Sequence, residues 1–113
     1  MTQLQITQPD DWHVHLRDGD VLNHVAPFTA QQFARAIVMP NLQPPVTTDK
    51  QAVEYVDRID SAIGESDFEP LMTLYLTDDT TAEEIVLAEK SCFVKAVKLY
   101  PAGATTNSSA GVT

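Results

Sequence analysis

The sequence predicts an α/β fold built on a parallel sheet, and two observations lead to this prediction. Four segments with the composition of buried strands alternate with helix-like segments along the 113 residues. The connections between them are short, which is typical of βα units with parallel strands. Four such units suit a small open sheet, or half of an eight-stranded barrel of about 250 residues. Composition alone does not choose between these two architectures.

The four predicted strands are segments rich in large and apolar residues, at residues 11–16, 34–39, 70–76 and 94–100. The first is followed by Arg17-Asp18-Gly19 and the second ends at Pro40, and both are turn-forming sequences. The segment after the fourth strand, residues 101–113, is rich in Gly, Ala, Ser and Thr and is expected to be a loop.

Three segments have helical patterns, and the clearest is residues 49–63. Thr48 or Asp49 is expected to cap its start and Gly64 its end. Another helix is expected within residues 21–33, interrupted at Pro27 because proline lacks the backbone N–H. A third should run from residue 80 or 81 to residue 91. In the clearest helix, apolar residues recur at spacings of three and four: Ala52, Val53, Val56, Ile59 and Ile63.

Composition and charge exclude several classes of partner. The net charge is −9, and an acidic surface repels phosphate backbones, so we expect no nucleic-acid partner. A local arginine or a metal can still attract a small anionic substrate. The single cysteine, Cys92, cannot form an internal disulfide and is expected to be a buried structural thiol. We find no signal peptide and no run long enough to span a membrane, which favours the cytoplasm.

Candidate metal ligands lie at the end of the first predicted strand. His13, His15 and Arg17 alternate there, and side chains two apart on a strand point to the same face. Both imidazoles are therefore placed to reach one metal ion, with Arg17 beyond them at the carboxyl end, where parallel α/β folds bind ligands. The same spacing also fits a solvated or core pair of histidines, and the pattern alone leaves both interpretations open.

Two further polar residues follow later strands. Asn41 comes after the second strand, where it offers an amide donor and acceptor or serves simply as a turn residue. In the fourth strand, a period of two places Val94, Ala96 and Lys98 on one face. A buried lysine has a lowered pKa and is available for covalent chemistry, including carboxylation by carbon dioxide. Taken alone, Lys98 is better explained as a surface lysine whose stem is buried and whose amine reaches water.

The loop after the fourth strand is rich in hydroxyl groups. Thr105, Thr106, Asn107, Ser108 and Ser109 lie in it. Most loops of this kind are exposed connectors. Because this one follows the strand that carries Lys98, it is also placed to act as a lid over a site.

Together these segments resemble the type II dihydroorotases of the amidohydrolase superfamily, over nearly the whole chain and in the right order. The resemblance is carried by residues 9–20 (PDDWHVHLRDGD), 36–42 (AIVMPNL), 44–48 (PPVTT), 71–78 (LMTLYLTD), 98–101 (KLYP) and 104–108 (ATTNS). It implies a TIM-like (β/α)8 barrel, of which residues 1–113 would be a single incomplete domain: the N-terminal half, with about four βα units.

The resemblance also implies a metal site. His13 and His15 would bind the more buried of two zinc ions, and a carboxylated Lys98 would bridge both ions. The implied reaction is the reversible conversion of L-dihydroorotate and N-carbamoyl-L-aspartate in pyrimidine biosynthesis. Arg17 and Asn41 would hold the substrate carboxylate, and Thr105 and Thr106 would belong to a mobile loop over the substrate.

The family pattern contains residues that this chain lacks. Two further histidine ligands and a catalytic Asp are expected on strands beyond Thr113. The isolated chain is therefore expected to bind zinc poorly and to be inactive, whereas the complete protein would be a homodimer. Two alternatives remain at this point: another amidohydrolase, such as a hydantoinase or an allantoinase, and a truncated chain without catalytic activity.

Overall fold

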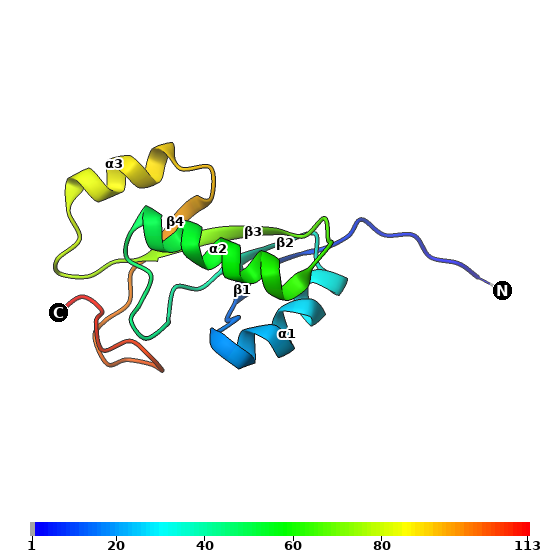
Figure 1. Cartoon of the computed structure of the whole chain (residues 1–113), viewed down its shortest axis with the longest axis horizontal. Coiled ribbons are helices and arrows are strands. Elements are labelled where there is room, and N and C mark those ends of the chain that lie inside the picture. Colours follow the sequence, from blue (N-terminus) through cyan, green and yellow to red (C-terminus); the bar gives the residue numbers. More distant parts are fainter. Residues whose placement is uncertain (1) are drawn as a thin grey trace.

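The computed structural model describes residues 2–113 and contains one four-stranded sheet with a helix after each of its first three strands (Figure 1). All strand pairs are parallel, in the order β1-β2-β3-β4. Doubly wound sheets reverse their strand order at a switch point, whereas barrels continue in chain order. The α/β prediction is confirmed, and this order favours a barrel segment. The elements are β1 (Asp10–Val14), α1 (Gly19–Gln32), β2 (Arg35–Val38), α2 (Asp49–Ile63), β3 (Glu69–Tyr75), α3 (Ala82–Lys90) and β4 (Val94–Lys98).

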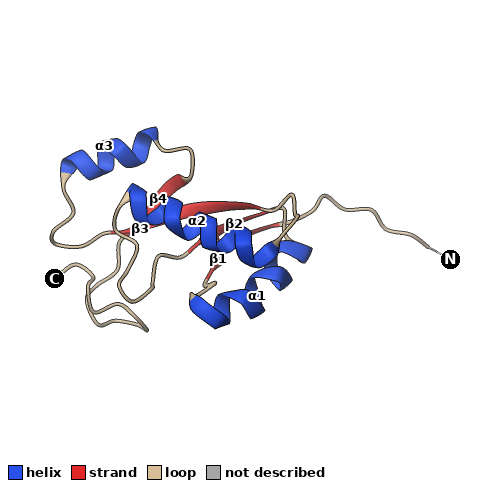
Figure 2. Ribbon diagram, in the orientation of Figure 1, coloured by secondary structure: helices blue, strands red, loops and turns tan. Residues whose placement is uncertain are grey.

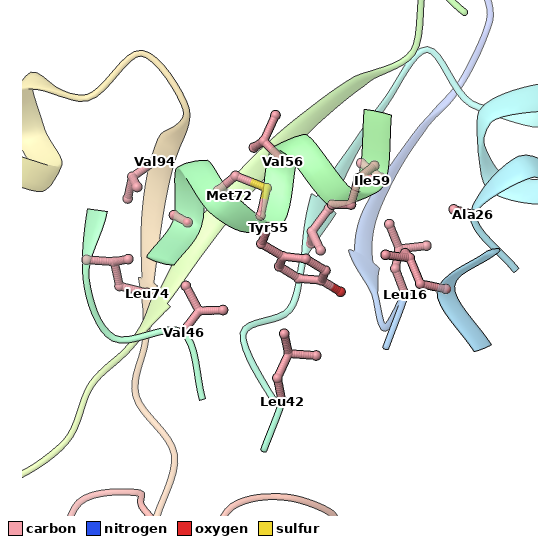
Figure 3. Packing of buried hydrophobic residues seen from close by; sticks show 14 of the residues in the cluster. Leu16, Ala26, Leu42, Val46, Tyr55, Val56, Ile59, Met72, Leu74 and Val94 are labelled. Atoms are coloured by element: carbon pink, nitrogen blue, oxygen red, sulfur yellow. The ribbon is translucent and has the colours of Figure 1, made fainter. Parts of the chain in front are cut away.

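The core lies between one face of the sheet and the helices α1 and α2, which lie side by side on it (Figure 2). Val38 of β2 and Met72 of β3 are at most 1% exposed. They belong to one cluster with Leu22 of α1 and with Tyr55 and Ile59 of α2, part of which is drawn in Figure 3. No helix within residues 2–113 is long and apolar enough to cross a membrane.

Helix α2 spans the residues predicted for it and has the end signals expected from the sequence. The Thr48 side chain accepts a hydrogen bond from the Gln51 backbone N–H, and the Gln51 side chain accepts one from the Thr48 backbone N–H. This reciprocal capping box satisfies two amides that have no partner inside the helix. Gly64 ends the helix with φ +66°, a conformation that glycine adopts without a steric penalty.

The expected interruption at Pro27 was wrong, because α1 continues through it to Gln32. A proline inside a helix removes one backbone hydrogen bond, here the bond to the carbonyl of Asn23, which is an exposed residue. Leu22 and Ala26 are buried, at 2% and 1% exposure, against the core. The burial of this apolar face holds the helix together across the missing bond.

The predicted alternation in β4 was also partly wrong. Met72 lies opposite Val94 and Thr73 lies opposite Ala96, so two residue steps in β4 match one step in β3. This extra residue forms a β-bulge. Because Met72 and Thr73 point to opposite faces, Val94 and Ala96 do so too. Val94 belongs to the core cluster, whereas Ala96 and Lys98 face the side of the sheet that α1 and α2 leave uncovered.

Helix α3 buries fewer of its side chains than α2 does. Ala88 is its only buried residue, and Ile85, Val86 and Leu87 are exposed. Cys92, in the turn between α3 and β4, is exposed as well. The prediction of a buried thiol was therefore wrong, because this turn lies at the margin of the described sheet.

Candidate functional site

The two histidines of the first strand meet at the carboxyl end of the sheet. Their Nε2 atoms are 3.2 Å apart and their ring centroids 5.2 Å apart. His13 belongs to β1, and His15 is the first residue after Val14, where that strand ends. The spacing argument for a shared face is thus supported by direct contact between the two rings.

A β-bulge in β1 orients this pair. Asp11 lies opposite Ala36 and Val14 lies opposite Val38, so three residue steps in β1 match two in β2. Val14 consequently packs against the core cluster. His13 and His15 flank Val14 in the chain and therefore point to the other face, away from α1 and α2.

Arg17 follows the histidines in an unusual backbone conformation. Its φ is +59°, in the left-handed region that few residues other than glycine adopt. The hydroxyl of Tyr55 donates a 2.5 Å hydrogen bond to the Arg17 carbonyl oxygen. The Nη1 atom of Arg17 is buried and, among the described residues, has no hydrogen-bond partner. An unpaired buried donor of this kind is costly unless a ligand satisfies it.

Asn41, which follows β2, and Lys98, at the end of β4, lie at the same end of the sheet as the histidines. The Lys98 Nζ donates a 2.7 Å hydrogen bond to the Asn41 Oδ1, and Asn41 is 1% exposed. The Asn41 Nδ2 is buried and lacks a partner within residues 2–113. Lys98 is partly buried, with its Nζ 5.2 Å from the ring centroid of Tyr100. The surface-lysine interpretation therefore does not describe Lys98.

The surroundings of His15 and Lys98 favour the neutral forms of these two side chains. Burial lowers the pKa of His15, and the positive charges of Arg17 and Lys98 lower it further. Burial likewise lowers the pKa of Lys98, with a contribution from the nearby charge of Arg17. A neutral imidazole can bind a metal, and a neutral amine can react with carbon dioxide. The cluster itself contains no carboxylate, so an anionic ligand would be attracted despite the acidic net charge of the chain.

The loop of residues 101–113 folds back toward Asn41. A bridge between Pro101 and Val112 closes it. The Asn107 Nδ2 donates to the Asn41 backbone oxygen at 3.3 Å, and the Gln43 Nε2 donates to the Asn107 Oδ1 at 3.1 Å. Thr105 and Thr106 are exposed on this loop. The structure thus places the loop beside the cluster, and the backbone N–H and carbonyl of Thr105 hydrogen-bond to the Ser108 side chain within the loop.

The histidine pair can supply two ligands to one metal ion. Two Zn–N bonds of about 2.0–2.1 Å at a tetrahedral angle separate the nitrogen atoms by roughly 3.3 Å, close to the separation observed here. Within residues 2–113, no three His, Cys, Asp or Glu side chains gather at metal-binding distance. A further anionic ligand from the described residues would therefore have to come from a modified Lys98.

Two residues support the cluster, of which the sequence analysis missed Tyr55 and named Ser108 only as one hydroxyl of the loop. Tyr55 lies on the buried face of α2 and is 0% exposed. A phenol within an apolar helical stripe signals a hydroxyl that needs a buried partner, but the sequence does not identify Arg17 as that partner. Ser108, 1% exposed, hydrogen-bonds to both the N–H and the carbonyl of Thr105 and so shapes the loop.

Comparison with known proteins gives consistent matches. The sequence profile of the amidohydrolase family matches residues 10–113. A dihydroorotase of Cupriavidus necator is 69% identical over 115 residues, which cover 100% of this chain and 33% of the relative. A dihydroorotase of Acaryochloris marina is 64% identical with the same coverage. This chain therefore spans about a third of the length of the curated relatives it matches.

Two solved structures share the fold. A dihydroorotase from Campylobacter jejuni aligns with a TM-score of 0.86 and 40% identity, covering 94% of this chain and 30% of the other. A dihydroorotase from Saccharomyces cerevisiae in complex with 5-fluoroorotic acid aligns with a TM-score of 0.83 and 39% identity, covering 92% of this chain and 28% of the other. The fold described above is the N-terminal part of the barrel in those structures.

Proposed function

This chain belongs to the amidohydrolase family, and from that premise we propose that it is the N-terminal part of a dihydroorotase. The reaction would be the reversible conversion of L-dihydroorotate and N-carbamoyl-L-aspartate in pyrimidine biosynthesis. Hydrolysis breaks the ring amide C–N bond, adds the hydroxyl of water to the carbonyl carbon and returns a proton to the nitrogen. The observation that carries the proposal is the cluster of His13, His15, Arg17, Asn41 and Lys98 at one end of the sheet.

The substrate carboxylate would bind to Arg17 and Asn41. Both side chains have a buried donor, Nη1 and Nδ2 respectively, that has no partner within the described residues. A carboxylate supplies two acceptor oxygens, and a guanidinium binds such a group with charge-assisted hydrogen bonds. Binding would therefore satisfy both donors at once, which an uncharged ligand of similar size would do less well.

A metal cofactor fits the donor set, and we propose that it is zinc, two ions in the complete site. His13 and His15 would bind one ion, and a carboxylated Lys98 would bridge both. Zinc supplies Lewis acidity and activates water as a nucleophile at neutral pH. Carboxylation requires a neutral amine, which the lowered pKa of Lys98 favours. The reaction also replaces the ammonium with an anionic oxygen ligand, so the repulsion between Lys98 and Arg17 disappears.

Residues 1–113 would then form a single incomplete domain. The two remaining histidine ligands and the catalytic Asp would lie beyond Thr113, so the isolated chain would be inactive. Thr105 and Thr106 would contact the substrate when their loop closes. The complete protein would act in the cytoplasm as a homodimer on small-molecule substrates, with no nucleic-acid or membrane partner.

The test is to assay the complete protein with zinc and bicarbonate for hydrolysis of L-dihydroorotate, hydantoin and allantoin. We expect N-carbamoyl-L-aspartate to form from dihydroorotate, with little turnover of the other two substrates. His13→Ala should lose both activity and bound zinc, measured by elemental analysis. His24→Ala, on the exposed side of α1, is the matched control and should retain both.

Preferential hydrolysis of hydantoin or allantoin would instead identify another amidohydrolase. Turnover by the 113-residue chain alone would contradict the proposed need for residues beyond Thr113. Failure of the complete protein to hydrolyse any of the three substrates would support a chain without this catalytic activity.

A further inference from the structure

The turn that carries Arg17 stores backbone strain. Arg17 has φ +59° and is not glycine. Such a conformation is unfavourable for a residue with a side chain and persists only where surrounding contacts hold it. Arg17 lies between the histidine pair and α1, so any relaxation of its backbone would move the guanidinium relative to the site. Contacts that oppose this relaxation therefore help to keep the guanidinium at the site.

One contact comes from the centre of α2, distant in sequence. The Tyr55 hydroxyl donates a 2.5 Å hydrogen bond to the Arg17 carbonyl oxygen, across 38 positions of the chain. Tyr55 is fully buried, and its ring points from α2 toward the end of the sheet near Leu16 and Leu42 (Figure 3). Because the ring is packed in the core, its hydroxyl is held at a fixed place and the carbonyl it binds is held as well.

A second contact comes from the next turn of the same helix. The Arg58 Nε donates a 2.9 Å hydrogen bond to the Oδ1 of Asp18, the residue after Arg17 and the N-cap of α1. The Arg58 guanidinium carbon also lies 5.3 Å from the ring centroid of Tyr55. Tyr55 and Arg58 are three residues apart on α2 and so share one face. Two consecutive residues of the turn are thus held from one helix.

We propose that Tyr55 is a positioning residue for recognition of the substrate carboxylate, because its hydroxyl holds Arg17 in the left-handed conformation that keeps the guanidinium at the site. Arg58 supports the same turn through Asp18. This inference rests on the proposed role of Arg17. It assigns to α2, which supplies no side chain to the cluster itself, a part in setting the affinity for substrate.

The Tyr55 hydroxyl is suited to donate its hydrogen bond at every physiological pH. Burial raises the pKa of its hydroxyl, so the phenol stays protonated across the physiological range and keeps donating. The Arg17 carbonyl would otherwise be left without this partner in a partly buried turn. The positioning contact should therefore not depend on pH near neutrality.

The experiment is Tyr55→Phe in the complete protein, with Ile59→Val as the matched control. Phenylalanine preserves the packing of the ring and removes only the hydroxyl. We expect KM for L-dihydroorotate to rise about three- to tenfold, the range of one hydrogen bond, with kcat within about twofold. Ile59 is another fully buried residue of α2 that makes no hydrogen bond to the turn. Its variant should lose thermal stability but keep the KM of the wild type.

A double mutant separates positioning from a general loss of structure. In an Arg17→Lys background, Tyr55→Phe should add no further rise in KM, because the group it positions is already altered. An equal rise in both backgrounds, or a rise with Ile59→Val, would overturn the proposal.

Arg58→Gln should raise KM by up to about threefold. Arg35→Gln breaks a comparable exposed ion pair, with Asp10 at the start of β1, and should leave KM unchanged.

If the wild-type complete protein does not hydrolyse dihydroorotate, the proposed function fails. The positioning role of Tyr55 is then tested by the backbone conformation of Arg17 instead of by KM. A crystal structure of the Tyr55→Phe protein should then show Arg17 outside the left-handed region or in several conformations. An unchanged Arg17 conformation in that variant would contradict the positioning role by itself.

Discussion

At the scale of single residues, Gly111 shows how closely the last described loop is packed. A Cβ at this position would lie 2.3 Å from the Tyr100 carbonyl oxygen and 3.0 Å from the Ala102 backbone nitrogen. The same segment contains the bridge between Pro101 and Val112 that closes the loop. A side chain at Gly111 would therefore push residues 111–112 away from residues 100–102, and these two segments hold the loop beside Asn41.

We accordingly predict that Gly111→Ala opens this loop and lowers the free energy of unfolding of the complete protein by about 1–3 kcal/mol. Thermal unfolding measures the loss, and limited proteolysis should show new cleavage within residues 101–113. Gly103→Asn is the control. Gly103 has φ +76° with open space around it, and Asn tolerates this region better than other residues with side chains. A Gly111→Ala protein as stable and as protease-resistant as the wild type would contradict the prediction.

At the scale of elements, α2 and α3 have similar caps but different packing. Thr48 and Thr81 each accept a hydrogen bond from a backbone N–H three residues later. The face of α2 is buried in the core, whereas α3 buries only Ala88. A cap contributes to global stability only when its helix unfolds together with the rest of the protein.

We therefore predict that Thr48→Ala lowers the global free energy of unfolding by about 1 kcal/mol. Thr81→Ala should have a smaller global effect and should mainly increase hydrogen exchange in α3. Urea denaturation and hydrogen-exchange mass spectrometry of the complete protein compare the two. Equal losses of global stability would show that α3 is as firmly coupled to the core as α2.

At the scale of the whole molecule, the sheet has one covered face and one open face. Trp12 is 71% exposed and lies beside Ile37 and Leu71 in a hollow on the open face. Another hollow, of about 360 Å³, lies between α3 and β4 and is lined in part by Ile85 and Val97. In a closed barrel the open face becomes the interior, and the outer strands β1 and β4 each gain a neighbour.

The isolated 113-residue chain should therefore expose apolar surface that the complete protein buries. We predict that it binds the dye ANS, self-associates in sedimentation experiments and shows strong acrylamide quenching of Trp12, its single tryptophan. The complete protein under the same conditions should bind little ANS. A monomeric isolated chain without ANS binding would show that four strands and three helices are sufficient for a closed core.

The sequence was most informative where local chemistry decides the structure. The start and end of α2 were predicted from Thr48 and Gly64, because capping depends on residues within one turn of the helix. The sequence-based predictions for Pro27, Cys92 and Val94 were wrong, because the structure at each position depends on contacts with distant segments. Burial of Leu22 and Ala26 keeps α1 continuous, the margin of the sheet exposes Cys92, and a bulge against β3 turns Val94 toward the core.

The same division applies to the candidate site. The sequence by itself determined the parallel α/β class, the strand ends that carry His13, His15, Asn41 and Lys98, and the family resemblance, because these follow from short-range periodicity and from motifs. Only the tertiary structure decided that Lys98 contacts Asn41 across 57 positions and that Tyr55 holds Arg17 across 38. No local pattern encodes such pairs, because they arise when the burial of the apolar faces brings distant segments together.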